Sequence, residues 1–194
     1  MRYRLEKVHT VVSAAEYIAR YRDAERFLGY CRECDNYGRL WMCPPYGFDV
    51  LGRIAGYGWI YIFGVKVVVD EAVRRLPADA AQLRDISYSI IKEVREPFDG
   101  WLLELERRYH GSLAFFAGSC LLCGDEGCAR ATGGSCLYPD RARSSLEAYG
   151  FDISRTGSEL LGIELKWSEG LALPEYFTLV SGLFTDYEIG DLVW

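Results

Sequence analysis

The residues of this sequence best suited to chemistry are seven cysteines, and they fall into two groups. The first group is Cys31, Cys34 and Cys43, and the second is Cys120, Cys123, Cys128 and Cys136. Both groups lie in segments rich in glycine and polar turn residues, which predict loops, and loops carry sites more often than core packing. Because the number is odd and the N-terminus lacks the apolar core of a signal peptide, the thiols favour metal or redox chemistry over disulfides.

The four-cysteine segment has the spacing Cys-x2-Cys-x4-Cys-x7-Cys, with glycines between the thiols. Four thiolates on a flexible loop can hold a [4Fe–4S] cluster, and glycines let the backbone approach the sulfides. Structural zinc also takes four thiolates, but commonly from two Cys-x-x-Cys knuckles, and this segment has only one. The spacing therefore favours iron–sulfur, with zinc and then free or redox thiols as alternatives, and it differs from the bacterial ferredoxin pattern.

Positive charge follows the last thiol of this segment. Pro139 and Asp140 predict a helix start, so the positive end of a helix dipole would lie near Cys136. Arg141 and Arg143 fall in the first turn of that helix and would stabilise a cluster that carries about two net negative charges. The alternative is that both arginines lie on a solvated helix face and pair with Asp140 or Glu147.

The three-cysteine segment, Cys-x2-Cys-x8-Cys, is one ligand short of a closed metal site. A fourth ligand could come from Asp35, Asp49 or a histidine, or the position could stay open for substrate, as in catalytic metal sites. Near the last thiol, Arg39, Trp41 and Tyr46 suit the binding of a small anionic substrate. Three interpretations compete: a second cluster with an open iron, a site shared with the four-cysteine segment, and zinc or a redox Cys-x-x-Cys.

Composition limits the partners. The chain has 194 residues and a formal net charge of −6, which argues against non-specific nucleic-acid binding. Its most apolar stretch, residues 54–69, contains Lys66 and is shorter than the ~20 residues of a membrane span. We therefore expect no membrane insertion, a cytoplasmic location, and a redox partner protein or a small anionic substrate as the binding partner.

The rest of the chain alternates helices and strands in its hydrophobic pattern. We expect strands at 2–12, 59–69, 113–118 and 176–184, and helices at 14–28, 48–54, 79–110 and 140–149. Pro97 should kink or divide the longest of these helices. The pattern predicts a single α/β or α+β domain over residues 1–194, with a mixed β-sheet flanked by helices. The two cysteine-rich metal-binding loops are residues 31–46 and 118–139.

The region around the four cysteines resembles a known family. The stretch WLLELERRYHGSLAFFAGSCLLCGDEGCARATGGSCLYPDRARSSLEAYGFD looks like the hallmark region of the predicted metal-binding proteins called domain of unknown function 2284. The matching features are Leu105-Glu106, a Gly-x-Cys-x-x-Cys from Gly118 to Cys123, a Gly-x-x-Cys from Gly133 to Cys136, Pro139, and a closure from Arg143 to Asp152. The first cysteine segment, with its Cys-Pro-Pro, is similar to the family's other motif.

This resemblance implies metal binding, by iron–sulfur, in bacteria and archaea that often live without oxygen, and it implies no settled reaction. Ser144 and Leu146 depart from the pattern, where proline and methionine are expected, but the thiols are untouched. Our leading hypothesis is a cytoplasmic iron–sulfur protein in which the four cysteines hold one [4Fe–4S] cluster that passes electrons. The three cysteines would hold a second metal centre where a small substrate or partner binds. The alternatives are a zinc-stabilised binding or regulatory module and an electron carrier for a partner enzyme.

Overall fold

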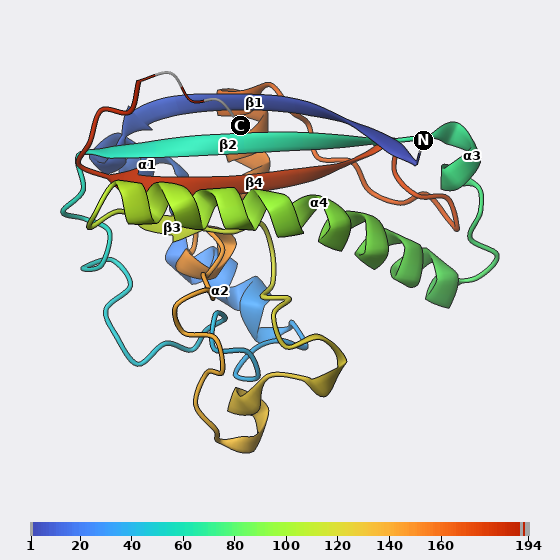
Figure 1. Ribbon diagram of the computed structural model, residues 1–194, viewed down its shortest axis with the longest axis horizontal. Coiled ribbons are helices and arrows are strands. Elements are labelled where there is room, and N and C mark those ends of the chain that lie inside the picture. The colour runs from blue at the N-terminus through green and yellow to red at the C-terminus, as the bar shows by residue number, and fades with distance from the viewer. Residues whose placement is uncertain (1, 191, 193–194) are drawn as a thin grey trace.

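The sheet of this protein is antiparallel throughout. In the computed structural model, which describes residues 2–190 and residue 192, the strand order is β1-β2-β4-β3 (Figure 1). The strands are β1 (Tyr3–Ser13), β2 (Trp59–Val69), β3 (Leu113–Phe115) and β4 (Tyr176–Thr185). The last strand, β4, lies between β2 and β3 and runs opposite to both.

The observed sheet agrees with the predicted fold class in one respect and differs from it in another. The described residues form one α+β domain, as predicted, while the predicted mixed sheet is wrong because every pair of neighbouring strands is antiparallel. Residue 1 and residues 191, 193 and 194 of the predicted domain lie outside the described residues.

Helices of very different length accompany the sheet. They are α1 (Ala14–Tyr21), α2 (Ala24–Arg32), α3 (Glu71–Arg74), α4 (Ala80–Arg108), α5 (Ile153–Arg155) and the π-helix η4 (Thr156–Leu161). Three short 3₁₀ turns are η1 (Gly124–Glu126), η2 (Ala129–Thr132) and η3 (Glu147–Tyr149). Among the described residues, no helix combines the length and the apolar character that crossing a membrane would need.

Two predicted helices differ in the structure. The helix expected at 14–28 is divided into α1 and α2, because Asp23 starts a new helix by accepting the N–H of Arg26 over 3.2 Å. Residues 48–54 form turns, and the Asp49 carboxylate accepts the N–H of Leu51 there.

The central strand β2 is buried on both faces. Tyr61, Phe63 and Val65 pack in the core cluster that includes the buried side chains of α4. Ile60 and Ile62 point to the opposite face and pack with α1 and the segment around η3 and η4. Because successive side chains of a strand alternate between faces, the unbroken apolar run of β2 supports two hydrophobic layers.

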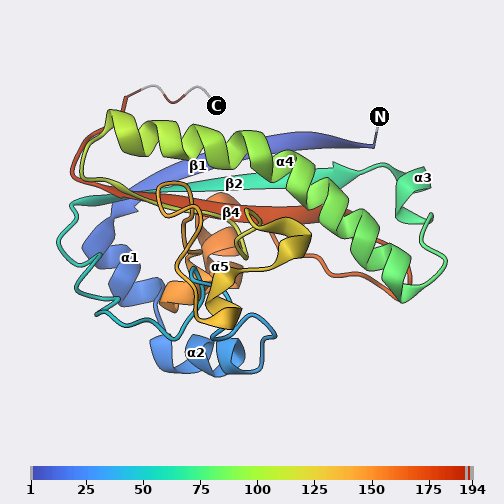
Figure 2. The same cartoon turned by 60° about the horizontal axis from the view of Figure 1, so that its bottom comes forward.

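The long helix α4 continues through Pro97, so the proline does not divide it. Figure 2 shows that the two halves of α4 run in different directions. This bend agrees with the loss of one backbone hydrogen bond at a proline inside a helix. The helix begins at Asp79, whose carboxylate accepts the N–H of Gln82 over 2.8 Å.

The helix predicted at 140–149 does not form; turns and the short η3 replace it. The carbonyl of Ser144 accepts the N–H of the distant Phe116 over 3.0 Å. In an α-helix a carbonyl accepts the N–H four residues later, so this bond does not follow the helical pattern. The predicted helix dipole beside Cys136 is therefore wrong.

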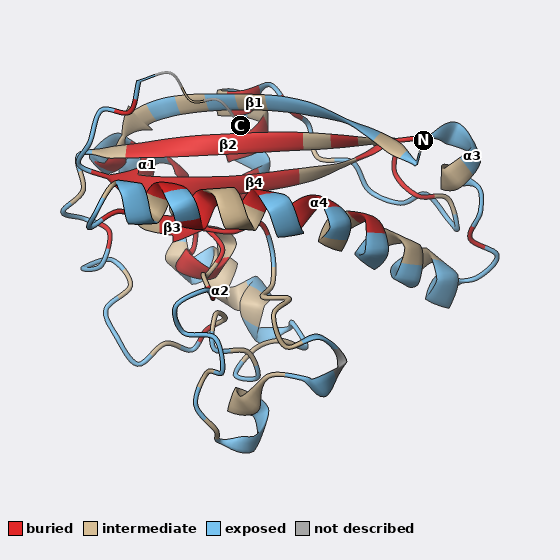
Figure 3. Cartoon of the chain, in the orientation of Figure 1, coloured by how far each residue is buried: buried red, intermediate tan, exposed pale blue. Residues whose placement is uncertain are grey.

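Both cysteine segments lie away from the sheet, at the bottom of Figure 1. The chain enters the second segment directly after β3, which is shorter than the predicted strand at 113–118. Figure 3 shows that these segments consist mostly of exposed and partly buried residues, whereas the strands β2 and β4 above them are mostly buried. The two cysteine segments thus lie next to each other, on one side of the layer formed by the sheet and α4.

Candidate metal centre

The first three thiols gather at the end of α2. Cys31 lies in the last turn of the helix and is half-buried, and Cys34 follows it and is exposed. Turns bring Cys43 back beside them, and the N–H of Gly38 closes this return by donating to the carbonyl of Pro44 over 2.8 Å. The three thiols line one pocket of about 170 Å³.

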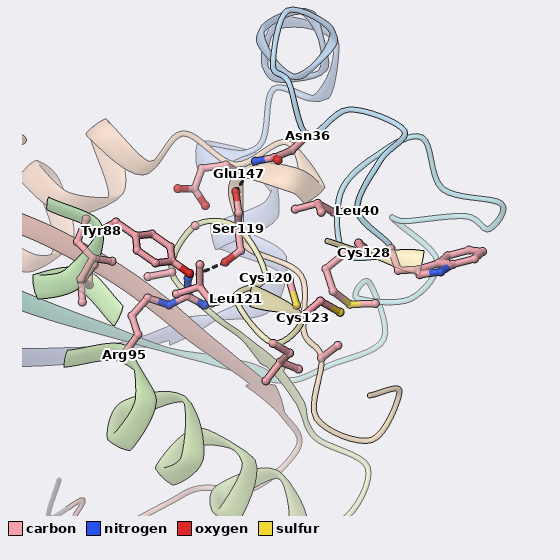
Figure 4. A pocket seen from close by; sticks show the side chains of 18 of the residues that line it. Asn36, Leu40, Tyr88, Arg95, Ser119, Cys120, Leu121, Cys123, Cys128 and Glu147 are labelled. Atoms are coloured by element: carbon pink, nitrogen blue, oxygen red, sulfur yellow. Dashed lines mark hydrogen bonds between the residues drawn. The ribbon is translucent and has the colours of Figure 1, made fainter. Parts of the chain in front are cut away.

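The other four thiols line a second, larger pocket, and Figure 4 shows Cys120, Cys123 and Cys128 on the same side of it. Burial and the neighbouring thiols raise the pKa of Cys123, which also shares a hydrogen bond with Cys128. Between them, Gly127 has φ +75° and ψ 167°, a backbone conformation open essentially to glycine alone. The turn that presents these thiols therefore depends on that glycine.

The two groups of thiols adjoin. Four residues line both pockets: Asn36, Gly118, Ser119 and Glu147. Burial raises the pKa of the Cys43 thiol to about 12, and the charges of Cys34, Cys31 and Cys120 add to that rise. Because Cys120 belongs to the other group, the electrostatic interaction crosses between the two sets of thiols.

The chemistry of the donor set fits a metal. All seven thiols are free, and soft sulfur donors in sets of four and three suit iron–sulfur clusters and zinc. Over residues 2–190 and 192, no three Cys, His, Asp or Glu side chains are already arranged to hold a metal ion. The thiols would close on a metal as it binds, which is common where metal binding and local folding are coupled.

Arg130 joins the two cysteine loops through hydrogen bonds, a role that the sequence patterns did not predict. Its guanidinium donates to the backbone carbonyls of Leu40 over 2.7 Å, of Cys43 over 2.6 Å and of Pro45. The same group lies 5.3 Å from the ring centroid of Trp41. An arginine inside a cysteine loop, close to Cys128, is the sequence signal that could have found it.

Two further contacts join the loops. The indole N–H of Trp41 donates to the carbonyl of Gly134 over 3.0 Å, and the side-chain amide of Asn36 donates to the hydroxyl of Ser119 over 2.9 Å. Trp41 also lines the four-cysteine pocket. The predicted site residue Trp41 thus holds the second loop against the first.

The other predicted residues of the first segment lie further from the thiol pockets. Arg39 is exposed and lines neither of them. The hydroxyl of Tyr46 lies 2.8 Å from the carbonyl of Met42 and 3.0 Å from the hydroxyl of Ser144, and burial raises its pKa. Tyr46 also stacks on Phe48, so its contacts are those of a packing residue, and the predicted role of Arg39 toward an anion stays a prediction.

Arg141 and Arg143 differ from each other. Arg143 makes several hydrogen bonds to the carboxylate of Glu106 on α4, and both side chains are less than one-fifth exposed. Arg141 is exposed and lies 5.9 Å from the ring centroid of Tyr138. The interpretation that an arginine pairs with a carboxylate describes Arg143, although its partner is the distant Glu106 and not a nearby carboxylate such as Asp140 or Glu147.

Arg95 and Asp99 form a buried charged pair beside the four-cysteine pocket, which the sequence patterns did not predict either. Arg95 on α4 donates to the carbonyl of Ser119 over 2.6 Å and to the carboxylate of Asp99 over 2.9 Å. Burial raises the pKa of Asp99 to about 6, although the charge of Arg95 opposes the rise. The spacing of four residues between Arg95 and Asp99 is the sequence signal for such a pair on one helix face.

Glu147 is a second buried carboxyl group at this place. Burial raises its pKa, and hydrogen bonds from its own N–H and from Ser145, together with the charge of Arg95, oppose the rise. Since Glu147 lines both thiol pockets, its carboxyl group is the acidic feature that the two share.

Comparison with known proteins gives a family match. The model of the family described as a predicted metal-binding protein (DUF2284) matches residues 18–184. No curated protein and no solved structure matches the chain. The matched range contains both groups of cysteines and leaves the metal unspecified.

Proposed function

This chain belongs to the predicted metal-binding family DUF2284, and we propose that it is an iron–sulfur protein with two neighbouring metal centres. Cys120, Cys123, Cys128 and Cys136 hold a [4Fe–4S] cluster in this proposal, and Cys31, Cys34 and Cys43 hold a second centre. When bound, the four-thiolate cluster supplies one-electron chemistry.

The observation that carries the proposal is the shared boundary of the two thiol pockets. Ser119 and Glu147 line both, and the charge of Cys120 acts on Cys43. Two centres this close can exchange electrons, so the four-cysteine centre would pass electrons and the three-cysteine centre would be where a partner or small substrate acts. Three thiols leave one position for that ligand.

The chain's own residues have defined tasks in this arrangement. Arg130 and Trp41 hold the loops together, as their hydrogen bonds to Cys43 and Gly134 indicate. Arg95 fixes the backbone of Ser119, the residue before the first ligand of the four-cysteine group. The exposed Cys34 marks the side from which a redox partner protein would reach the second centre.

We place the protein in the cytoplasm, because seven free thiols persist best in a reducing compartment. Purification of the full chain without oxygen tests the metal assignment. The expected protein is brown, absorbs broadly in the visible, and contains iron and sulfide at about four or more of each per chain. Colourless protein with stoichiometric zinc would contradict the iron–sulfur assignment and support a zinc-stabilised module.

A further inference from the structure

The four-cysteine pocket extends beyond the thiols into a cavity of about 650 Å³, a size typical of small-molecule sites. The cavity lies beside the edge of β4. Because β3 pairs only with Gly182 to Phe184, residues 178–180 of β4 have no strand partner on that side among the described residues. Side chains of α4 close one side of the opening (Figure 4), and the segment from α5 to Trp167 closes another.

Most of the wall is apolar. It includes Ile91 of α4, Leu179 and Val180 of β4, and Ile153, Leu165 and Trp167 of the segment that precedes β4. Trp167 is 77% exposed although it lines the cavity, so a large aromatic side chain is available at its mouth. A ligand with an apolar body would cover this surface.

Three residues of the wall each carry a buried polar atom that has no hydrogen-bond partner among the described residues. These atoms are Nε of Arg95, Oε2 of Glu147 and Oγ1 of Thr178. The other guanidinium nitrogens of Arg95 are bonded to Ser119 and Asp99, and its side chain is only 3% exposed. Buried polar atoms are almost always satisfied, because leaving them unpaired is costly. Figure 4 shows Arg95 and Glu147 pointing into the same space.

We propose that this cavity binds a small molecule that carries a neutral amide on an apolar body, with its N–H donated to Glu147 and its carbonyl accepting from Arg95. An amide offers a donor and an acceptor on neighbouring atoms, whereas an alcohol has a single proton to donate. A carboxylate ligand would meet the Glu147 carboxyl group and the thiols, and an ammonium ligand would meet the Arg95 guanidinium. Thr178 completes the polar end as donor or acceptor.

This inference rests on the proposed function in one respect. The four thiols line the same cavity, so the amide-bearing molecule would lie against the metal centre that they hold. The polar contacts themselves come from Arg95, Glu147 and Thr178 and not from the metal. Binding and metal content can therefore be measured separately.

The test uses the full chain as purified without oxygen, after its iron, sulfide and zinc have been measured. Benzamide is titrated by ligand-observed NMR and by tryptophan fluorescence, with benzoate and benzylamine as charged analogues of the same size. We expect benzamide to bind, and each charged analogue to bind about tenfold or more weakly. Equal or tighter binding of benzoate or benzylamine overturns the assignment of an amide.

Two variants locate the contact. Glu147→Leu and the isosteric Thr178→Val should each weaken benzamide binding by about tenfold. Ser181→Ala is the matched control, because Ser181 carries another β4 hydroxyl that is buried with no hydrogen-bond partner among the described residues, but it does not line the cavity. Melting temperatures show which variants are folded. If Glu147→Leu is not folded, Thr178→Val still tests the proposed contact.

The outcomes separate the two proposals. Metal-loaded protein that does not bind benzamide, or variants that bind it like wild type, overturns this inference and leaves the proposed function standing. Protein that binds benzamide through Glu147 and Thr178 but contains no iron supports this inference and contradicts the iron–sulfur assignment.

Discussion

The guanidinium of Arg130 donates to the backbone carbonyl of Cys43 over 2.6 Å, so a residue of the four-cysteine loop holds the position of a thiol in the three-cysteine loop. The same guanidinium also bonds the carbonyls of Leu40 and Pro45. A single planar group with several fixed N–H donors can serve three carbonyls at once. The backbone positions of the two cysteine loops, and with them the two candidate centres, are therefore coupled.

Replacing Arg130 by Gln should loosen both centres together. Hydrogen bonds from a charged donor contribute about 1.5–3 kcal/mol each in favourable cases, and three carbonyls lose their partner. We expect a lower melting temperature and a loss of metal from both thiol groups, measured by thermal unfolding and by iron analysis. Arg84→Gln is the control, since Arg84 is an exposed arginine on α4 and belongs to neither cysteine loop. An Arg130→Gln protein with wild-type metal content would show that the loops hold their metal independently.

Replacing Cys136 by Ala should remove roughly half of the iron if the two thiol groups hold separate clusters of equal size. The complementary variant Cys43→Ala should remove the remainder and leave the four-cysteine cluster, so each variant is the control of the other. Iron and sulfide analysis and the electron paramagnetic resonance spectra of the reduced proteins check this. Loss of all iron in either folded variant would point to one shared site.

Gly127→Ala should lower the metal content of the four-cysteine group alone. The φ of +75° with ψ of 167° at Gly127 strains any residue with a Cβ, by about 1–3 kcal/mol. Because Gly127 precedes Cys128, the relaxed turn would displace that thiol. Gly29→Ala is the matched control: Gly29 lies inside α2, a Cβ there meets no atom within 4 Å, and alanine favours helix. Equal iron in both variants would mean that the turn is not needed for metal binding.

The secondary structure that follows from local pattern was predictable, and the parts that depend on distant contacts were not. The apolar run of β2 and the helical spacing of α4 indicate their elements almost to the residue. The position of β4 between β2 and β3 is a pairing across most of the chain, which no local pattern encodes.

The same distinction applies to the site. The grouping of the seven thiols and their suitability as metal ligands follow from their spacing, because the ligands of one site are close together in the sequence. Arg130 and Arg95 act through hydrogen bonds to residues that are distant in sequence, Cys43 and Ser119, and the distant charge of Arg95 acts on Glu147. Their roles depend on the fold that brings the two loops together.

Arg143→Met should destabilise the fold and leave the metal content unchanged. The Arg143 guanidinium and the Glu106 carboxylate are 19% and 12% exposed, and Glu106 also accepts the N–H of Ala114 at the start of β3. Removing one partner of a largely buried pair costs about 3 kcal/mol, which chemical denaturation can measure. The double variant Arg143→Met with Glu106→Gln should recover part of that loss, because it leaves no unpaired charge. A selective loss of iron in folded Arg143→Met would instead support the sequence-based role of Arg143 at the cluster.

Asp99 should make stability fall as the pH rises through about 6. Burial raises the pKa of Asp99 from its usual 3.8 to about 6 in the folded protein, so folding takes up a proton between these values. Stability contributed by the protonated carboxyl group is therefore present at pH 4 and is lost as Asp99 ionises. A shift of this size corresponds to about 3 kcal/mol.

The variant Asp99→Asn isolates this effect, because its amide oxygen can still accept the hydrogen bond from Arg95 that the carboxylate accepts over 2.9 Å. We expect the free energy of unfolding of wild type, relative to Asp99→Asn, to decrease between pH 4 and pH 7 in denaturant titrations. Asp85→Asn, an exposed carboxylate on the same helix, corrects for the loss of a charge from α4. A difference between wild type and Asp99→Asn that stays constant over this range would mean that the Arg95 charge cancels the cost of burying Asp99.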